Sequence, residues 1–170
     1  FCFPVRRYYE RLGFHLTDSE WVRIAAEFHD RYRPLAADAP LRPGVLAALR
    51  RMRRRGWTLS ILSASEITLL EHMVRARRIR GFFAHIAGLR DYYARSKIYL
   101  GRELLAASGG DPAGAILIGD TLHDYEVARE LGCRCILVAG GHQTEAFLRA
   151  SGATVIRDFR ELPAALRQIL

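Results

Sequence analysis

Two aspartates follow one short apolar run, and their spacing makes them candidates for metal chemistry. Residues 115–119 read AILIG, Asp120 comes directly after them, and Asp124 lies four positions further on. Thr121 and Asp124 would fit the start of a helix, but this interpretation leaves Asp120 unexplained. Two close carboxylates repel each other unless a cation lies between them, and Mg²⁺ is the usual cation beside phosphate. The spacing therefore predicts that Asp120 and Asp124 hold Mg²⁺.

A single lysine is the second candidate. The chain has 26 Lys and Arg residues, and Lys97 is the only lysine among them. An ammonium is a compact point charge that can contact one carboxylate and one phosphate oxygen, whereas a guanidinium is a planar fork. Because the helix dipole disfavours a cation in the first turn of a helix, an incidental surface lysine is a weak explanation. We therefore expect Lys97 to be catalytic.

A serine pair supplies the third candidate. Ser63, Ala64 and Ser65 follow the apolar run at 57–62, WTLSIL, and precede a predicted helix. A hydroxyl beside free backbone amides at a helix start can bind an anion, although serine is also a common N-cap. The order along the chain carries more weight: a hydroxyl, then a lysine, then an acidic pair. This order is suited to phosphoryl transfer, with Ser63 catalytic beside Lys97, and with Ser63, Ala64 and Lys97 binding the phosphate.

The pattern of apolar residues predicts how these side chains are positioned. Residues 1–40 read as two helices, the second opened by a Thr17 and Glu20 capping box and ending before Pro34. From residue 41 onward, short apolar runs alternate with helical stretches, which is typical of right-handed βαβ units and a parallel sheet. We expect strands near 57–62, 85–89, 115–119, 134–139 and 154–156, and helices near 4–12, 43–55, 66–78, 98–107, 122–131, 144–150 and 160–169. Ligands bind such sheets beyond the carboxyl ends of the strands.

Composition excludes several classes of protein. The 170 residues are 50% hydrophobic and 26% charged, which is a globular balance. No apolar run approaches the roughly 18 residues that a membrane span needs, so we expect no membrane partner. Cys2, Cys133 and Cys135 form no paired framework and no metal-ligand pattern. They are interpreted as small buried hydrophobes of a protein in the reducing cytoplasm.

The basic charge of the chain suggests nucleic-acid binding at first sight. The net charge is +8, and residues 50–55 read RRMRRR. This run ends a predicted helix, where cations suit the dipole, and Gly56 follows as the stop. The arginines are also spread along the whole chain, without aromatic residues interleaved in this cluster. We therefore predict no nucleic-acid partner, whereas strongly salt-dependent retention on heparin would favour an arginine-mediated nucleic-acid binder.

The combined motifs resemble those of the haloacid dehalogenase superfamily, and specifically its phosphoglycolate-phosphatase-like branch. Ser63 is similar to the second motif of the family, Lys97 to the third, and GDTLHD, with Asp120 and Asp124, to the fourth. The resemblance implies an α/β, Rossmann-like core over residues 41–170, with a parallel sheet flanked by helices, and a small helical cap over residues 1–40. It implies a Mg²⁺-dependent phosphatase that acts on a small phosphorylated metabolite through an aspartyl-phosphate intermediate.

The first motif of the family is absent from these residues. In the family a DxDGT-like segment on the central strand carries the nucleophile, and the sequence holds no Asp-x-Asp. The resemblance implies that this segment lies upstream of Phe1, and that without its strand the two flanking strands have unpaired edges. A non-catalytic binding or regulatory relative would also lack the nucleophile and is the alternative. The presence of Lys97 and both aspartates favours the enzyme.

Overall fold

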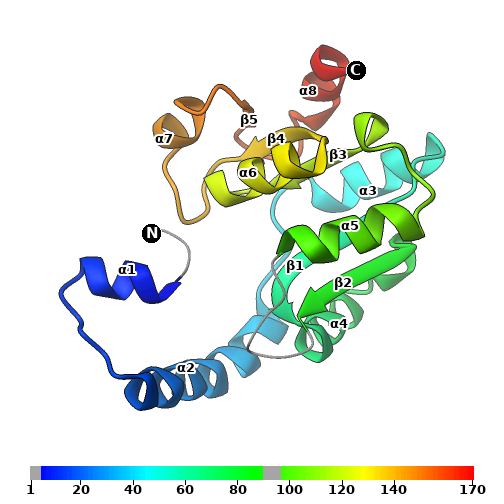
Figure 1. The fold of residues 1–170 in the computed structure, drawn as a ribbon. Coiled ribbons are helices and arrows are strands. Elements are labelled where there is room, and N and C mark those ends of the chain that lie inside the picture. Colours follow the sequence, from blue (N-terminus) through cyan, green and yellow to red (C-terminus); the bar gives the residue numbers. More distant parts are fainter. Residues whose placement is uncertain (1–4, 90–96) are drawn as a thin grey trace. The chain divides into compact units, whose positions relative to one another are not determined.

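The computed structural model describes residues 5–89 and 97–170. The chain divides into two compact units, Phe1–Ala39 and Pro40–Leu170, and each is described by itself (Figure 1). Cys2 and residue 4, the start of the first predicted helix, lie outside the described residues. No helix of the described ranges combines the length and the apolar character needed to cross a bilayer.

The first unit is a pair of helices joined by aromatic side chains. The helices are α1 (Val5–Arg11) and α2 (Asp18–Asp38). The Tyr9 ring of α1 lies 5.7 Å from the Trp21 ring of α2 in an edge-to-face arrangement. Aromatic pairs prefer this geometry because the positive edge of one ring faces the negative face of the other. This ring contact, with a hydrogen bond of 2.6 Å from Arg6 to Asp18, joins the two helices.

The two ends of α2 give different outcomes for the sequence predictions. The capping box is confirmed: the Thr17 backbone N–H donates to the Glu20 carboxylate at 2.8 Å, and the Glu20 backbone N–H donates to the Thr17 hydroxyl at 3.3 Å. The predicted end before Pro34 is wrong, because the helix continues through this proline to Asp38. A proline inside a helix costs about 3 kcal/mol, but a leucine and two alanines, which are strong helix formers, follow it directly.

The second unit alternates helices and strands, which confirms the predicted α/β class. Its first part contains α3 (Val45–Arg54), β1 (Ser60–Glu66), α4 (Ile67–Ala76), the 3₁₀-helix η1 (Arg80–Phe82), β2 (His85–Leu89) and α5 (Lys97–Ala107). Its second part contains the 3₁₀-helix η2 (Pro112–Gly114), β3 (Ile116–Gly119), α6 (Leu122–Leu131), β4 (Arg134–Val138), α7 (Glu145–Arg149), β5 (Thr154–Ile156) and α8 (Leu162–Ile169). Every described strand pair is parallel, so the predicted βαβ reading holds.

The core of this unit is centred on β4, which pairs with β3 on one edge and with β5 on the other. Ile136 and Leu137 of β4 are fully buried, and so are Val127 of α6, Leu148 of α7 and Leu162 of α8. Burial of each such side chain is worth about 1.5–3 kcal/mol relative to exposure. The sheet whose strand β3 leads to the two aspartates is therefore well packed against the helices around it.

The first strand starts later than the sequence suggests. The apolar run at 57–62 predicted a strand that ends before Ser63, but β1 extends from Ser60 to Glu66. Trp57 lies instead in the turn after α3, where its backbone N–H donates to the carbonyl of Met52 at 3.1 Å. Pairing with β2 jumps from Leu62 to Glu66, so the intervening Ser-Ala-Ser segment forms an irregularity within the strand.

Between β1 and β3 the sheet is interrupted (Figure 1). The described residues form a two-stranded sheet, β1-β2, and a three-stranded sheet, β3-β4-β5. A groove of about 650 Å³ lies between the two sheets. Ser60, Ile61 and Leu62 of β1 line it, and so do Ile116 and Ile118 of β3. Within the described ranges, β1 and β3 are therefore each paired on one edge only, in agreement with the expected effect of a missing middle strand.

Candidate functional site

The lone lysine and the second aspartate form a buried ion pair. Lys97 is the first residue of α5, and its ammonium contacts the carboxylate of Asp124 in the first turn of α6. The Lys97 side chain is only 15% exposed and the Asp124 side chain 7%. Because the start of a helix disfavours a cation, the contact with Asp124 is what stabilises the ammonium at this position. The fold thus brings together two candidate residues that are 27 positions apart in the sequence.

The second oxygen of Asp124 holds the segment that leads into α6. Its Oδ2 accepts hydrogen bonds from the Asp120 backbone N–H at 3.1 Å, the Thr121 backbone N–H at 3.0 Å and the Thr121 hydroxyl at 2.8 Å. Burial has the largest single influence on the pKa of Asp124 and raises it, but the Lys97 charge and these donors outweigh it. The pKa of Asp124 is therefore lowered below its ordinary value, and the carboxylate is charged at neutral pH.

The first aspartate lies directly beside this pair with a carboxylate that is not engaged. Asp120 follows the carboxyl end of β3 and is half-buried. Its side chain forms no hydrogen bond or ion pair with any other residue that the structure describes. The strand ends in glycine because a β-carbon at Gly119 would overlap the side chain of Asp124. The glycine therefore lets Asp124 pack against the strand end, where it positions the backbone of Asp120.

The loop after β4 packs against the carboxylate of Asp120. A β-carbon at Gly141 would overlap the carboxylate of Asp120, so the loop backbone lies directly against this group. Gln143 accepts a hydrogen bond from the Leu122 backbone N–H at 2.7 Å, which links the loop to the start of α6. Sequence reasoning did not assign a role to either residue. The one available signal was the Gly-Gly pair after a strand, which often marks a close backbone approach.

Ser63 and Ala64 lie within β1, which corrects the prediction that they follow the strand at the start of a helix. The Ser63 hydroxyl accepts a hydrogen bond from the Ser65 backbone N–H at 3.0 Å. Helix α4 is capped instead by Glu66, whose carboxylate accepts from two backbone N–H groups of the first turn at 2.7 and 3.0 Å. A carboxylate already occupies these amides, so the expected anion cradle at the helix start is not available. A role for Ser63 and Ala64 in phosphate binding stays a prediction.

The two described cysteines are not part of a reactive site. Cys133 and Cys135 are free and partly buried. Burial raises the pKa of both thiols, and for Cys135 the nearby Asp124 charge adds to this effect, so that its pKa is about 12. The thiols are therefore neutral at physiological pH, as expected for small apolar side chains.

The carboxylate oxygens of this site are suited to a hard cation that also binds water and phosphate. In residues 5–89 and 97–170, no three His, Cys, Asp or Glu side chains gather to form a complete metal site. The open carboxylate of Asp120 is the available ligand, whereas both Asp124 oxygens already have hydrogen-bond partners. Magnesium in phosphate sites commonly uses one or two carboxylates, with water and phosphate as the remaining ligands. Asp120 fits this pattern directly, and Asp124 fits it best as the group that positions Asp120.

Comparison with known proteins identifies relatives of this chain. The profile of the haloacid dehalogenase-like hydrolase family matches residues 3–138. The chain is 30% identical over 131 residues to "Probable phosphatase IndB" of Dickeya dadantii, a match over 75% of this chain and 56% of that protein. It is 28% identical over 171 residues to a phosphoglycolate phosphatase of Caulobacter vibrioides, covering 98% of this chain and 71% of the relative. A crystal structure of a "predicted phosphatase" from Clostridium acetobutylicum has a TM-score of 0.81, with 19% identity over 96% of this chain and 76% of that chain.

These matches settle the class of the protein. The chain belongs to the haloacid dehalogenase-like hydrolase family. The resemblance to its phosphoglycolate-phosphatase-like branch, made on Ser63, Lys97 and the two aspartates, is also confirmed. The chain spans little more than half the length of IndB, because the match covers 56% of that protein.

Proposed function

We propose that this chain is part of a phosphatase that hydrolyses a small phosphomonoester with the help of Mg²⁺. One observation carries the proposal: the buried Lys97–Asp124 pair lies beside the open carboxylate of Asp120 at the end of a parallel strand. A buried ammonium and carboxylate are costly to desolvate, and an ammonium held in this way can also contact a phosphate oxygen. Relatives named as phosphatases support the same reaction.

Asp120 would hold the Mg²⁺ ion, with Asp124 contributing by its position or through water. When bound, the ion stabilises negative charge on the oxygens of the phosphoryl group. Asp124 has a second task, because it keeps the ammonium of Lys97 in place through their direct contact. The terminal phosphate of a phosphomonoester carries two negative charges, and both the ammonium of Lys97 and the divalent ion would contact its oxygens.

The residues of this chain would support a nucleophile that they do not include. An incoming aspartate would attack the phosphorus atom, and the bond from phosphorus to the alcohol oxygen would break. Lys97 would neutralise charge on the phosphate and on the nucleophile, and Ser63 would hold a phosphoryl oxygen. Water would then cleave the aspartyl phosphate and release inorganic phosphate. A second, upstream aspartate would protonate the leaving alcohol and deprotonate the water.

The groove between β1 and β3 supports this placement of the nucleophile. Both strands present an edge without a partner among the described residues, and the groove between them is lined largely by apolar side chains. A parallel strand in this groove could pair with both edges, and its carboxyl end would then lie at the same edge of the sheet as Asp120. We propose that the nucleophile is carried by such a strand and that residues 1–40 form a helical cap.

Release of inorganic phosphate from a generic phosphomonoester by the full-length protein tests the proposal. We expect turnover with Mg²⁺, none in excess chelator, and none in Asp120→Asn, whose melting temperature should stay close to that of the wild type. Glu130→Gln is the matched control, because Glu130 is an exposed carboxylate on α6 that does not line the groove. Full activity in chelator would contradict the metal site. No turnover of any phosphomonoester with Mg²⁺ would favour the non-catalytic alternative.

A further inference from the structure

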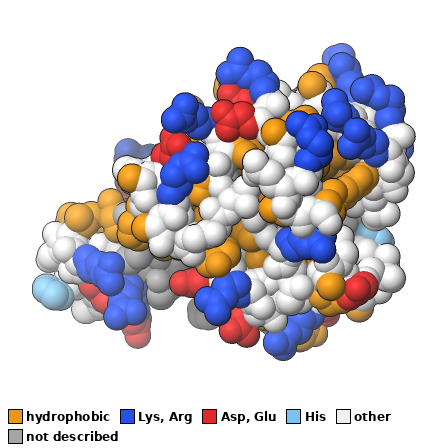
Figure 2. Space-filling model, turned by 90° about the horizontal axis from the view of Figure 1, so that it is seen from above, with side chains coloured by type: hydrophobic (Ala, Val, Ile, Leu, Met, Phe, Trp, Pro, Cys, Tyr) orange, Lys and Arg blue, Asp and Glu red, His pale blue; other side chains and the backbone are white. Residues whose placement is uncertain are grey.

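Most arginines of this chain lie on the surface, but Arg42 reaches into the fold. Figure 2 shows Lys and Arg side chains over much of one face of the molecule. Arg42 is half-buried and lies in the segment that leads into α3. Its Nη2 donates a hydrogen bond to the backbone carbonyl of Ala139, which directly follows β4 and is 97 positions away in the chain. A side chain that bridges two such distant segments can hold one of them in place.

The segment that carries Arg42 is itself fixed. The Arg42 carbonyl accepts a hydrogen bond from the Val45 backbone N–H at 3.2 Å, which closes a turn around Pro43 and Gly44. The proline ring restricts φ within this turn. A β-carbon at Gly44 would lie 2.8 Å from the backbone nitrogen of Arg160, so the turn packs directly against the segment before α8. The guanidinium therefore extends from a turn that is held by its own hydrogen bond and by packing.

The other end of this contact leads to the carboxylate of Asp120. Ala139 is buried, and its backbone N–H donates to the last residue of β5 at 2.8 Å, so this point belongs to the sheet. Gly140 follows with a φ of 82°, and a β-carbon there would lie 3.1 Å from the guanidinium of Arg42. The next residue, Gly141, packs against the Asp120 carboxylate. Only two residues thus separate the carbonyl that Arg42 binds from the backbone that touches the candidate metal ligand.

The loop after β4 is held at both of its ends. Arg42 holds the start, and Gln143 holds the end by accepting from the Leu122 backbone N–H at 2.7 Å. Gly141 lies between these two points, against Asp120. A carboxylate that is confined by packing loses less freedom when it binds a metal, and groups around a ligand tune the affinity in this way. We propose that Arg42 is a positioning residue that keeps this loop against Asp120 and so prepares the carboxylate for Mg²⁺, an inference that rests on the proposed metal site.

The charge of Arg42 by itself would act in the opposite direction. A cation near a metal site repels the metal, so removing this charge alone would tighten metal binding. Asp158 offsets part of the charge: its pKa is lowered to about 2, mainly by hydrogen bonds from Arg160 and to a smaller extent by the charge of Arg42. The contact with the loop and the charge therefore predict opposite changes in metal affinity when Arg42 is replaced.

Binding of Mn²⁺ to the full-length protein without substrate, followed by electron paramagnetic resonance, tests the inference. Mn²⁺ favours the same oxygen ligands as Mg²⁺, and the binding that Asp120→Asn abolishes defines the site. We expect Arg42→Met to weaken this binding by about three- to tenfold, because the carboxylate must then be ordered by the metal itself. Arg42→Lys should stay within about twofold of the wild type, since one nitrogen makes the contact and an ammonium can replace it.

Two further measurements separate positioning from general damage. In a phosphate-release assay, Arg42→Met should need more Mg²⁺ for half-maximal turnover, while its rate at saturating Mg²⁺ stays near that of the wild type. A loss of structure would instead lower the saturated rate and the melting temperature. Gly141→Ala acts on the same contact from the loop, because its β-carbon displaces the Asp120 carboxylate. It should weaken Mn²⁺ binding by a similar factor and leaves Arg42 unchanged.

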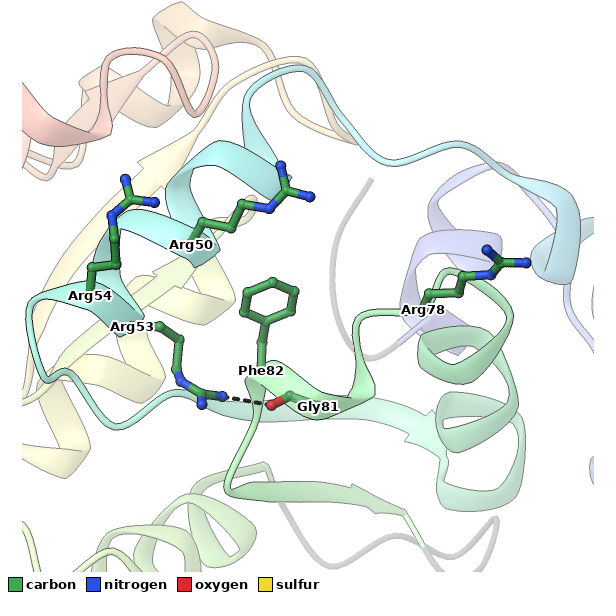
Figure 3. A pocket seen from close by; sticks show the side chains of 6 residues that line it. All are labelled: Arg50, Arg53, Arg54, Arg78, Gly81 and Phe82. Carbon is green, nitrogen blue, oxygen red and sulfur yellow. Dashed lines mark hydrogen bonds between the residues drawn. The ribbon is translucent and has the colours of Figure 1, made fainter.

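Arg53→Met is the matched control. Figure 3 shows that Arg53 also binds a backbone carbonyl, that of Gly81 in η1, at 2.6 Å, but before β2 rather than after a strand. This variant should change the affinity for Mn²⁺ by less than about twofold. The inference is overturned if Arg42→Met binds Mn²⁺ as tightly as Arg53→Met or more tightly, and if Arg42→Met does not fold, the same result for Gly141→Ala overturns it. A wild-type protein that binds no Mn²⁺ would overturn the proposed metal site as well.

Discussion

Replacing Asp124 by asparagine should cost stability as well as activity, because this carboxylate is the partner of a buried cation. Asp124→Asn keeps the shape of the side chain but removes the charge that Lys97 contacts. The ammonium of Lys97 would remain in place with its side chain only 15% exposed. It would then be a buried charge without its counter-ion.

The expected loss can be worked from this burial. Removing one partner of a buried ion pair costs about 3–5 kcal/mol. Two of the hydrogen bonds to Oδ2 come from backbone N–H groups and one from the Thr121 hydroxyl, and an asparagine oxygen can still accept them. The lost charge is therefore the main term. For a chain of this length, a loss of this size lowers the melting temperature by roughly 6–20 °C.

Urea and thermal unfolding at several pH values are the assay, with Glu130→Gln on the same helix as the exposed control. The pKa of Asp124 is lower in the folded protein than its ordinary value of 3.8, so the carboxylate contributes fully to the free energy of unfolding above this pH. This contribution is lost as the pH falls through the lower pKa that Asp124 has in the folded protein. The difference between the wild type and Asp124→Asn should therefore be full at pH 7 and should shrink only below about pH 4.

A double variant separates the charge effect from other damage. Lys97→Met combined with Asp124→Asn removes both charges, so it should be less destabilised than the sum of the two single variants. The reasoning is refuted if Asp124→Asn is no less stable than Glu130→Gln at pH 7. It is equally refuted if the single effects simply add.

Two further substitutions test the same group of contacts. Lys97→Arg should lose almost as much phosphatase activity as Lys97→Ala, since a planar fork does not replace a buried point charge that contacts Asp124; a Lys97→Arg rate near that of the wild type in a phosphate-release assay would contradict this. Gly119→Ala should destabilise the fold by about 1–3 kcal/mol, since its β-carbon overlaps the Asp124 side chain. Gly114→Ala, which places its β-carbon in open space, should change stability little in the same urea titration. Equal midpoints for the two glycine variants would show that the strand end tolerates a side chain.

Periodicity and capping patterns predict much of this fold because they report local physical preferences. The strand at 154–156 and the helix at 122–131 match their predicted bounds, since each has a clear apolar pattern between breakers or caps. The start of β1 is not predictable in this way. Trp57 is as apolar as a strand residue, but its backbone N–H donates to the Met52 carbonyl in the turn after α3. The continuation of α2 through Pro34 likewise depends on its surroundings rather than on the proline itself.

The sequence indicates the candidate residues better than it indicates their contacts. The isolation of Lys97 as the only lysine and the spacing of the two aspartates single out residues that the fold does bring together. Neither pattern reveals that Asp124 binds Lys97 while Asp120 stays open. The approach of Gly141 to Asp120 depends on a loop 21 positions away in the chain, and no local pattern reports such a contact.

Detection of a phosphorylated carboxylate tests the central claim most directly. The full-length protein would be mixed briefly with a phosphomonoester that carries a labelled phosphate, quenched in acid and divided into peptides. We predict label on an aspartate in a peptide outside residues 1–170, sensitive to hydroxylamine as an acyl phosphate is, and absent when Mg²⁺ is removed. Label on Ser63 that resists hydroxylamine, or turnover without any labelled peptide, would contradict the account.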